Sequence, residues 1–248
     1  MDFLDLKNKT ILITGASSGI GRKTAILLDD LGAKLLLTGR NIEKLEETKS
    51  QLKKEQHIFQ ADLTVEENRT ELIASLPKLD GVVNAAGIIY PFPLKFITEK
   101  HLETVFDINF KAQALLNSAL LKQKKVAEKC SFVFISSISS QFPYQGGALY
   151  TSAKAALEAY SRTLALEHSG KKIRSNCISP GLVKTNIFEE TLKASNTEEL
   201  EKYEKHYPLG FGEAIDVANT IAFLLSNRSR WITGQNIVLD GGLTLGSK

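Results

Sequence analysis

A tyrosine and a lysine one helical turn apart are the first residues in this sequence whose types and spacing suggest chemistry. Tyr150 and Lys154 lie in a segment with a helical pattern, so both side chains are expected on one helix face. A phenol, with a reference pKa of about 10, is a poor base near neutral pH, but a nearby ammonium favours the phenolate. Two unit charges ~4 Å apart at an effective dielectric of ~20 interact by roughly 4 kcal/mol, an upper guide to this effect. Tyr150 is therefore a candidate for proton exchange with a substrate oxygen.

A serine upstream gives this pair a more specific setting. Taken alone, Tyr-x-x-x-Lys is common by chance, and a plain helix-face pair has the same spacing. Ser137 follows an expected strand thirteen residues before Tyr150. The neighbouring serines 136, 139 and 140 are alternatives, and the spacing to Tyr150 favours Ser137. The order glycine-rich turn, serine, tyrosine, lysine is the specific signal.

The glycine-rich turn near residue 15 predicts a phosphate-binding site. The segment Thr14-Gly15-Ala16-Ser17-Ser18-Gly19-Ile20-Gly21 follows an apolar strand and opens a helix. Gly15 permits a tight turn, Gly19 lets the backbone approach a pyrophosphate, and Gly21 allows close helix packing, while the helix N-terminus offers free N–H groups. An ordinary strand-to-helix loop is the alternative, but three glycines at this spacing exceed what a mere turn requires. We therefore expect a dinucleotide contact from Gly15 and from residues 17 to 21.

The residues after the second expected strand favour NADP(H) over NAD. An NAD site usually has an acidic residue here for the ribose 2′-hydroxyl. Thr38-Gly39-Arg40-Asn41 contains no carboxylate, and the first one downstream is Glu43. The planar guanidinium of Arg40 suits a 2′-phosphate. If Arg40 is only a surface arginine, the choice of cofactor stays open.

Two later strand ends extend the expected cofactor site. Asp62 and Leu63 follow the third strand and are candidates to border an adenine. Asn84-Ala85-Ala86-Gly87 follows the fourth strand, where small residues allow the backbone to lie against a cofactor.

The elements that must position these residues alternate along the chain. Mostly apolar strands between helical segments are typical of a parallel sheet buried on both faces. We predict one domain over 1–248, an α/β Rossmann fold whose doubly wound parallel sheet has about seven strands and helices on both faces. The expected strands are Thr10–Thr14, Lys34–Thr38, His57–Gln60, Gly81–Asn84, Ser131–Ser136, Ile173–Ile178 and Asn236–Leu239. The expected helices are Gly19–Leu31, Ile42–Lys54, Val65–Ser75, Glu99–Lys122, Tyr150–His168 and Glu213–Ser226.

Composition argues against several other classes of function. The 248 residues carry a net charge of +3, with 43% hydrophobic and 24% charged residues, as in ordinary globular proteins. A lysine run near 122–129 is interpreted as a solvated helix end rather than a nucleic-acid patch, since no binding motif accompanies it. Two cysteines and four scattered histidines show no metal spacing. We expect no signal peptide, no membrane span and a cytoplasmic location.

With these motifs in place, the chain resembles the short-chain dehydrogenase/reductase family nearly end to end. The resemblance is carried by Thr14–Gly21, Asn84–Gly87, Asn109, Ser137, Tyr150, Lys154, the run Pro180-Gly181-Leu182-Val183-Lys184-Thr185, Ile232–Gln235 and Asp240–Gly242. Two features depart from the family's pattern: Ala85 replaces a usual asparagine, and the connection 75–80 is short.

The resemblance implies a role for each matching residue. Asn109 would kink its helix and anchor a proton-relay water, Ser137 would hold the substrate oxygen, and Lys154 would also bind the nicotinamide ribose. Residues 178–185 would border the nicotinamide, and the expected cofactor contacts there are Pro180, Gly181, Val183 and Thr185. The implied activity is NADP(H)-dependent hydride transfer to or from a carbonyl or alcohol carbon of a small molecule. The implied assembly is a homo-oligomer, a tetramer or dimer, through 99–122, 150–168 and the C-terminal segment.

The substrate remains open at this point. Contacts are expected from the loops 88–96, 138–147 and 186–211, the last interpreted as a helical lid. Their aromatic residues fit an apolar substrate, and equally a packed loop. A 3-oxoacyl thioester is one candidate, beside sugars, steroids and small ketones. The rival function is a non-catalytic NADP(H)-binding sensor on the same fold, which would not require Tyr150 and Lys154 together.

Overall fold

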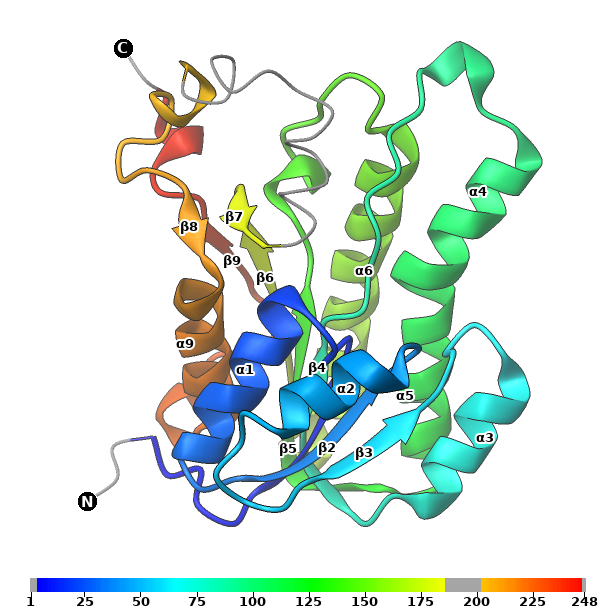
Figure 1. Cartoon of the computed structure of the whole chain (residues 1–248), viewed down its shortest axis with the longest axis vertical. Helices are drawn as coiled ribbons and strands as arrows, with labels where there is room; N and C mark the ends of the chain where they lie inside the picture. Colours follow the sequence, from blue (N-terminus) through cyan, green and yellow to red (C-terminus); the bar gives the residue numbers. More distant parts are fainter. Residues whose placement is uncertain (1–3, 186–201, 247–248) are drawn as a thin grey trace.

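The computed structural model describes residues 4–185 and 202–246, and its centre is a parallel sheet (Figure 1). Seven described strands pair in the order β3-β2-β1-β4-β5-β6-β9, and every pairing is parallel. The strands are β1 Thr10–Thr14, β2 Lys34–Gly39, β3 His57–Gln60, β4 Leu79–Asn84, β5 Val126–Ile135, β6 Arg174–Pro180 and β9 Asn236–Leu239. The chain adds strands outward from β1 to β3 on one side of the sheet and from β4 to β9 on the other. The strand order therefore switches between β1 and β4, and the carboxyl ends of these two strands flank the crevice where such sheets bind ligands.

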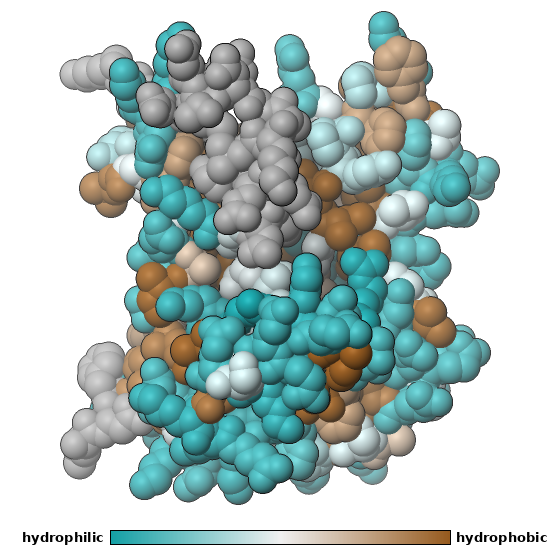
Figure 2. All heavy atoms as spheres, viewed as in Figure 1, coloured by the Kyte–Doolittle hydropathy of each residue, from teal (hydrophilic) through white to brown (hydrophobic). Residues whose placement is uncertain are grey.

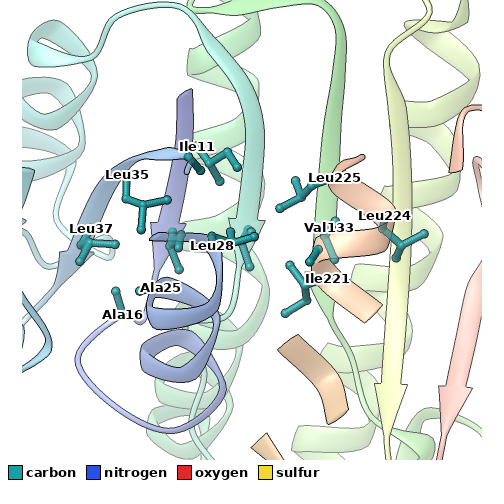
Figure 3. Close-up of a cluster of buried hydrophobic side chains, with 14 of the residues drawn as sticks. Ile11, Ala16, Ala25, Leu28, Leu35, Leu37, Val133, Ile221, Leu224 and Leu225 are labelled. Carbon is teal, nitrogen blue, oxygen red and sulfur yellow. The ribbon is translucent and has the colours of Figure 1, made fainter. Parts of the chain in front are cut away.

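Helices cover both faces of the sheet, which confirms the predicted doubly wound α/β fold (Figure 1). Successive strand residues point to opposite faces: Ile11 and Ile13 pack in one hydrophobic cluster and Leu12 in the other. Figure 3 shows the first cluster, where α1 and α9 pack on the strands; α3, α5 and α6 supply the second. The main helices are α1 Gly19–Asp30, α2 Ile42–Lys49, α3 Glu66–Ser75, α4 Glu99–Phe106, α5 Ala112–Lys122, α6 Ala148–Glu167 and α9 Ala214–Leu225.

The predicted helix 42–54 is five residues shorter in the structure, because α2 ends at Lys49. The cause is a contact with α1. The Asp29 carboxylate accepts hydrogen bonds from the Lys53 backbone N–H and the Gln56 side chain, both at 2.6 Å. These bonds fix the chain in a turn before β3. The charge-rich α2 lies under the hydrophilic surface in the lower centre of Figure 2.

The predicted helix 99–122 contains a π-turn, η2, over Asp107–Lys111 between α4 and α5. π-turns of this kind are frequent at functional sites, and this one contains Asn109. A small pair of parallel strands, β7 Val183–Lys184 and β8 Gly212–Glu213, was not predicted. Of the expected lid 186–211, residues 186–201 lie outside the described residues.

Candidate functional site

The glycine-rich turn packs directly against the turn after β4. Gly15 has φ +65°, and a Cβ on it would lie 2.8 Å from the Ala86 nitrogen. The Thr14 hydroxyl accepts hydrogen bonds from the backbone N–H groups of Ala85 at 3.1 Å and Ala86 at 3.2 Å. The sequence motif contained Thr14, but its role in joining the two turns was not foreseen. The first and fourth strand ends therefore form one surface.

The N-terminus of α1 opens onto this surface. Its N-cap, Ser18, is extended, and within the described residues no side chain caps the helix there. The first turn also lacks acidic residues. Free N–H groups and the positive end of the helix dipole make such a terminus an anion site. A pyrophosphate therefore fits the expected residues Ser17, Ser18, Gly19 and Ile20.

Gly21 has the role predicted for it, close packing of helix and turn. A Cβ at this position would lie 2.2 Å from the Gly15 carbonyl oxygen. Any larger residue would push α1 away from the turn. Gly19, by contrast, faces Thr185, whose side chain would be 3.5 Å from an added Cβ. The turn after β1 and the segment after β6 thus lie opposite each other.

The end of β2 presents Arg40 to solvent beside the phosphate turn. The Gln60 side chain donates a 3.0 Å hydrogen bond to the Arg40 carbonyl and fixes its backbone. Asn41 caps α2 by accepting from the Lys44 N–H at 2.7 Å. A Cβ on the adjacent Gly39 would lie 3.3 Å from the Ser17 hydroxyl. Arg40 is thus an exposed cation at the end of β2, preceded by Gly39 beside the Ser17 hydroxyl and followed by the N-terminus of α2.

The ends of β3 and β4 contribute mainly backbone. The Asp62 carboxylate accepts from the Thr64 N–H and hydroxyl at 2.9 and 2.7 Å. Leu63 packs in the core cluster formed with α3, so its side chain does not project from this edge. Asn84 is also fully buried, and its Oδ1 accepts from Asn117 of α5 at 2.9 Å. Cofactor contacts from Leu63 and Asn84 are therefore expected from their main-chain atoms.

Asn109 fastens the π-turn to the chain after β4. Its Oδ1 accepts from the Ile88 N–H, and its Nδ2 donates to the Ile88 carbonyl, both at 3.1 Å. A Cβ on Gly87 would lie 2.9 Å from Asn109 Oδ1 and 3.4 Å from Lys154 Nζ. Gly87 therefore allows two of the predicted catalytic residues to meet at the β4 turn.

Gln113 is a further polar residue of this region, and no motif in the sequence pointed to it. Its Nε2 donates to the Ala86 carbonyl at 2.8 Å and to the Asn109 carbonyl at 3.1 Å. The residue is fully buried. It links the β4 turn to the π-turn.

Ser137 and Tyr150 lie together at the carboxyl end of β5. Tyr150 is in the first turn of α6, is 8% exposed, and has the Ser137 hydroxyl as a hydrogen-bond partner. Ser137 Oγ also accepts from the Ser139 N–H at 3.2 Å and the Ser139 hydroxyl at 2.9 Å. Of the four neighbouring serines, Ser137 is therefore the one placed beside the phenol.

Lys154 follows one turn along α6 and lies beside Tyr150. Its Nζ lies 5.5 Å from the centre of the Tyr150 ring and donates a 2.7 Å hydrogen bond to the Ile135 carbonyl. Burial lowers the pKa of this ammonium to about 8. Its position agrees with the predicted pair.

The expected lowering of the phenol pKa is not found. Burial raises the pKa of Tyr150 above its ordinary value; the Ser137 hydrogen bond opposes this shift, and nearby Tyr144 adds to it. The reason is desolvation, which disfavours the charged form of each group. The phenol is thus held protonated at neutral pH, the state required of a proton donor.

The segment after β6 closes the other side of the site. Pro180 ends β6, and a Cβ on Gly181 would lie 3.0 Å from the Tyr207 ring. The Tyr207 hydroxyl accepts a 3.1 Å hydrogen bond from the Leu182 N–H. Val183 lies in β7, and its pairing with Gly212 ties the segment to the chain before α9. Tyr207, not selected from sequence, thus fixes the backbone that leads to Thr185.

Over residues 4–185 and 202–246, no cluster of three or more histidine, cysteine or acidic side chains is arranged to hold a metal ion. In the same part of the chain, no helix combines the length and apolar character needed to cross a membrane.

Comparisons with known proteins show the family to which the chain belongs. A family model described as enoyl-(acyl carrier protein) reductase matches residues 15–244. A 3-oxoacyl-(acyl-carrier-protein) reductase FabG of Rickettsia felis is 35% identical over 243 residues, covering 98% of this chain and 99% of the relative. The short-chain dehydrogenase/reductase aba4 of Botryotinia fuckeliana is 36% identical over 249 residues, covering 95% and 96%.

A solved structure is similar over nearly the same length. It is a short-chain dehydrogenase/reductase, titled glucose/ribitol dehydrogenase, from Brucella melitensis, with a TM-score of 0.90, 27% identity, and coverage of 97% of this chain and 98% of that one. A family model and relatives thus match nearly the whole chain, and the solved structure shares its fold. The chain belongs to the short-chain dehydrogenase/reductase family of oxidoreductases.

Proposed function

We propose that this protein is an NADPH-dependent reductase that converts a ketone of a small molecule to an alcohol. The observation that carries the proposal is the meeting of Ser137, Tyr150 and Lys154 at the sheet edge that also holds the phosphate turn. When bound, reduced nicotinamide supplies a hydride to the carbonyl carbon. The carbonyl oxygen receives its proton from Tyr150, and solvent returns a proton to the phenolate.

Each polar residue has a distinct task in this reaction. The Ser137 hydroxyl orients the carbonyl oxygen beside the phenol. Tyr150, held protonated by burial, acts as the general acid. The Lys154 ammonium, together with the positive end of α6, stabilises the phenolate that remains after proton transfer. Asn109 holds the π-turn against Ile88 and so fixes the backbone next to Lys154.

The preference for NADPH rests on Arg40. Arg40 is exposed, its neighbour Gly39 lies beside the Ser17 hydroxyl, and the segment 38–42 lacks a carboxylate for a ribose hydroxyl. A 2′-phosphate would be paired here, whereas NADH would leave the guanidinium without its anion. The whole chain, 1–248, is proposed to act as one NADP(H)-binding oxidoreductase domain.

A 3-oxoacyl thioester is the substrate we favour. The proposal draws on relatives named as 3-oxoacyl reductases and on an open groove of about 670 Å³ beside the site. Its lining is mostly apolar and includes Pro91, Pro93, Leu94, Pro143 and Tyr144. The two loops that form it are joined by a 2.8 Å hydrogen bond from the Phe92 N–H to the Gly146 carbonyl. Such a groove suits an acyl chain better than a sugar.

A homo-oligomer, tetramer or dimer, is proposed for the assembly. Large apolar side chains are exposed on the elements expected to associate: Leu115 of α5 is 41% exposed, Leu166 of α6 75%, and Trp231 near the C-terminal segment 90%. Burying such side chains between copies would be favourable. Size-exclusion chromatography with light scattering measures the mass; a monomer would contradict this part of the proposal.

The proposed activity is tested by following NADPH oxidation across a panel of ketones that includes 3-oxoacyl thioesters, sugars and steroids. We expect turnover, fastest with a 3-oxoacyl thioester. NADPH binding without turnover of any ketone would instead support a sensory protein on this fold. Turnover of sugars alone would overturn the substrate assignment while leaving the reaction type in place.

A further inference from the structure

A buried glutamate continues the row of functional side chains along α6. Glu158 lies one helical turn beyond Lys154 and two beyond Tyr150, so the three share one face of the helix. Its side chain is buried, with 6% of the residue exposed. In the part of the chain that the structure describes, no ion pair includes it. A buried carboxylate without a cation needs strong hydrogen-bond donors.

Three serine hydroxyls provide those donors, all to the same oxygen. Glu158 Oε1 accepts from Ser136 at 2.7 Å, from Ser140 at 2.6 Å and from Ser179 at 3.2 Å. Ser136 follows β5, Ser140 ends the short helix η3 (Ile138–Ser140), and Ser179 lies in β6. One carboxylate therefore ties the ends of two neighbouring strands to α6.

Two of these donors flank Ser137, the residue placed beside the phenol. Ser136 precedes it directly, and the Ser140 backbone N–H closes the turn that Ser137 begins by donating to the Ser137 carbonyl at 3.1 Å. In each of its bonds with the serine hydroxyls, Glu158 Oε1 is the acceptor, so it fixes the direction in which these hydroxyls point. Ser137 itself accepts from Ser139 twice, and its hydroxyl is also the hydrogen-bond partner of Tyr150.

We propose that Glu158 is a positioning residue that acts through Ser137. By holding the serines on either side, it sets the place and the hydrogen-bond direction of the hydroxyl that orients the carbonyl oxygen. The inference rests on the proposed reductase function. It assigns Glu158 to the rate of the chemical step, because its two shorter hydrogen bonds come from Ser136 and Ser140, on either side of Ser137.

Two substitutions of Glu158 should lower kcat to different extents. Glu158→Leu removes every acceptor, and each serine retains an alternative one: the Lys154 carbonyl at 3.4 Å, the Ser137 carbonyl at 2.8 Å and Asn236 Oδ1 at 2.8 Å. The turn then relaxes, and we expect kcat to fall about 10- to 100-fold, the scale of a misplacement near 1 Å. Glu158→Gln keeps one carbonyl acceptor and should recover most of that loss. The Kd of NADPH should stay within about twofold in both variants, since the phosphate turn and Arg40, which are proposed to bind NADPH, lie elsewhere.

A double-mutant cycle with Ser137→Ala separates positioning from general support of the fold. If Glu158 acts through Ser137, adding Glu158→Leu to Ser137→Ala should cost little further activity. An equal loss in both backgrounds, or a parallel loss of NADPH affinity, would overturn the inference. Glu167→Gln, at the exposed end of the same helix, is the matched control and should leave kcat unchanged.

A structural readout keeps this inference distinct from the proposed function. If the wild-type protein reduces no ketone, the reductase proposal fails by that result alone. Crystal structures of the wild type, Glu158→Leu and, should the leucine variant not fold, Ser140→Ala then decide the inference. Displacement of the 136–140 turn supports it, and an unmoved turn contradicts it.

Discussion

The two halves of the site use different kinds of chemical groups. On the β1–β2 side, backbone N–H groups, glycines and the exposed Arg40 form the surface, and the side chains that reach it lie near solvent. On the β5–β6 side, the working groups are buried side chains, Tyr150 at 8% and Lys154 at 3% exposure, whose pKa values are shifted by burial. The first half is suited to hold an anionic ligand, and the second to move a proton. Substitutions in the two halves should therefore separate affinity from rate.

The largest expected effect is on the proton-transfer side. Tyr150→Phe removes the acid and should lower kcat about 10²- to 10⁴-fold, the usual contribution of general acid catalysis. The Kd of NADPH, measured by fluorescence titration, should change little. Tyr160→Phe is the matched control, a phenol of the same helix that donates to Ala114 away from the cleft. A Tyr150→Phe variant with full activity would show that Tyr150 is not the general acid.

The next effect should appear on the binding side. Arg40→Asp replaces a phosphate partner with a like charge, so the Kd of NADPH should rise about 10- to 100-fold, the value of losing charge-assisted hydrogen bonds. NADH, which lacks the 2′-phosphate, should be affected far less. Arg230→Asp, another exposed arginine, should alter neither affinity. Equal losses for both cofactors would remove Arg40 from the site.

A steric test follows from the packing of the phosphate turn. Gly21→Ala places a methyl group 2.2 Å from the Gly15 carbonyl oxygen, and overpacking of this kind costs about 1–3 kcal/mol. We expect a lower free energy of unfolding in urea and weaker NADPH binding. Gly170→Ala, where an added Cβ would meet nothing within 4 Å, is the control. If the two variants are equally stable, the close approach of α1 to the turn is not required.

The pH dependence of the activity tests whether the charge on Lys154 is needed. Burial depresses the pKa of Lys154 from 10.5 to about 8, so the ammonium is charged below that pH and neutral above it. Burial shifts the pKa of Tyr150 upward, so the phenol keeps its proton through the same range. The kcat/KM for ketone reduction should therefore decline above about pH 8, approaching tenfold per unit where the charge is essential. A flat profile up to pH 10 would show that the charge on Lys154 is not needed.

The sequence predicted those features that depend on local pattern. The bounds of β1, β3 and β9 agree with the expected strands because short apolar runs between turns specify them. The pairing of Tyr150 with Lys154 followed from helix periodicity. The predicted end of α2 was wrong because it depends on long-range contacts. Asp29 contacts Lys53 and Gln56, which are 24 and 27 residues away in the sequence.

The electrostatics of the site could not be predicted in the same way. Attraction between Tyr150 and Lys154 would lower the phenol pKa, but the burial that both groups share raises it. Burial depends on the packing of the whole sheet edge, so the sign of the phenol shift required the structure. Gln113 and Tyr207 were missed for a similar reason, since their partners are backbone atoms of distant turns.

The central claim is that a hydride passes from the nicotinamide to a carbonyl carbon while the protein supplies the proton. The most direct test is a reduction with NADPH deuterated at C4 of the nicotinamide ring, the alcohol being analysed by mass spectrometry and NMR. We predict deuterium on the carbinol carbon with one of the two C4-labelled epimers and a solvent proton on the oxygen. Consumption of the labelled NADPH with no deuterium on that carbon would contradict the account.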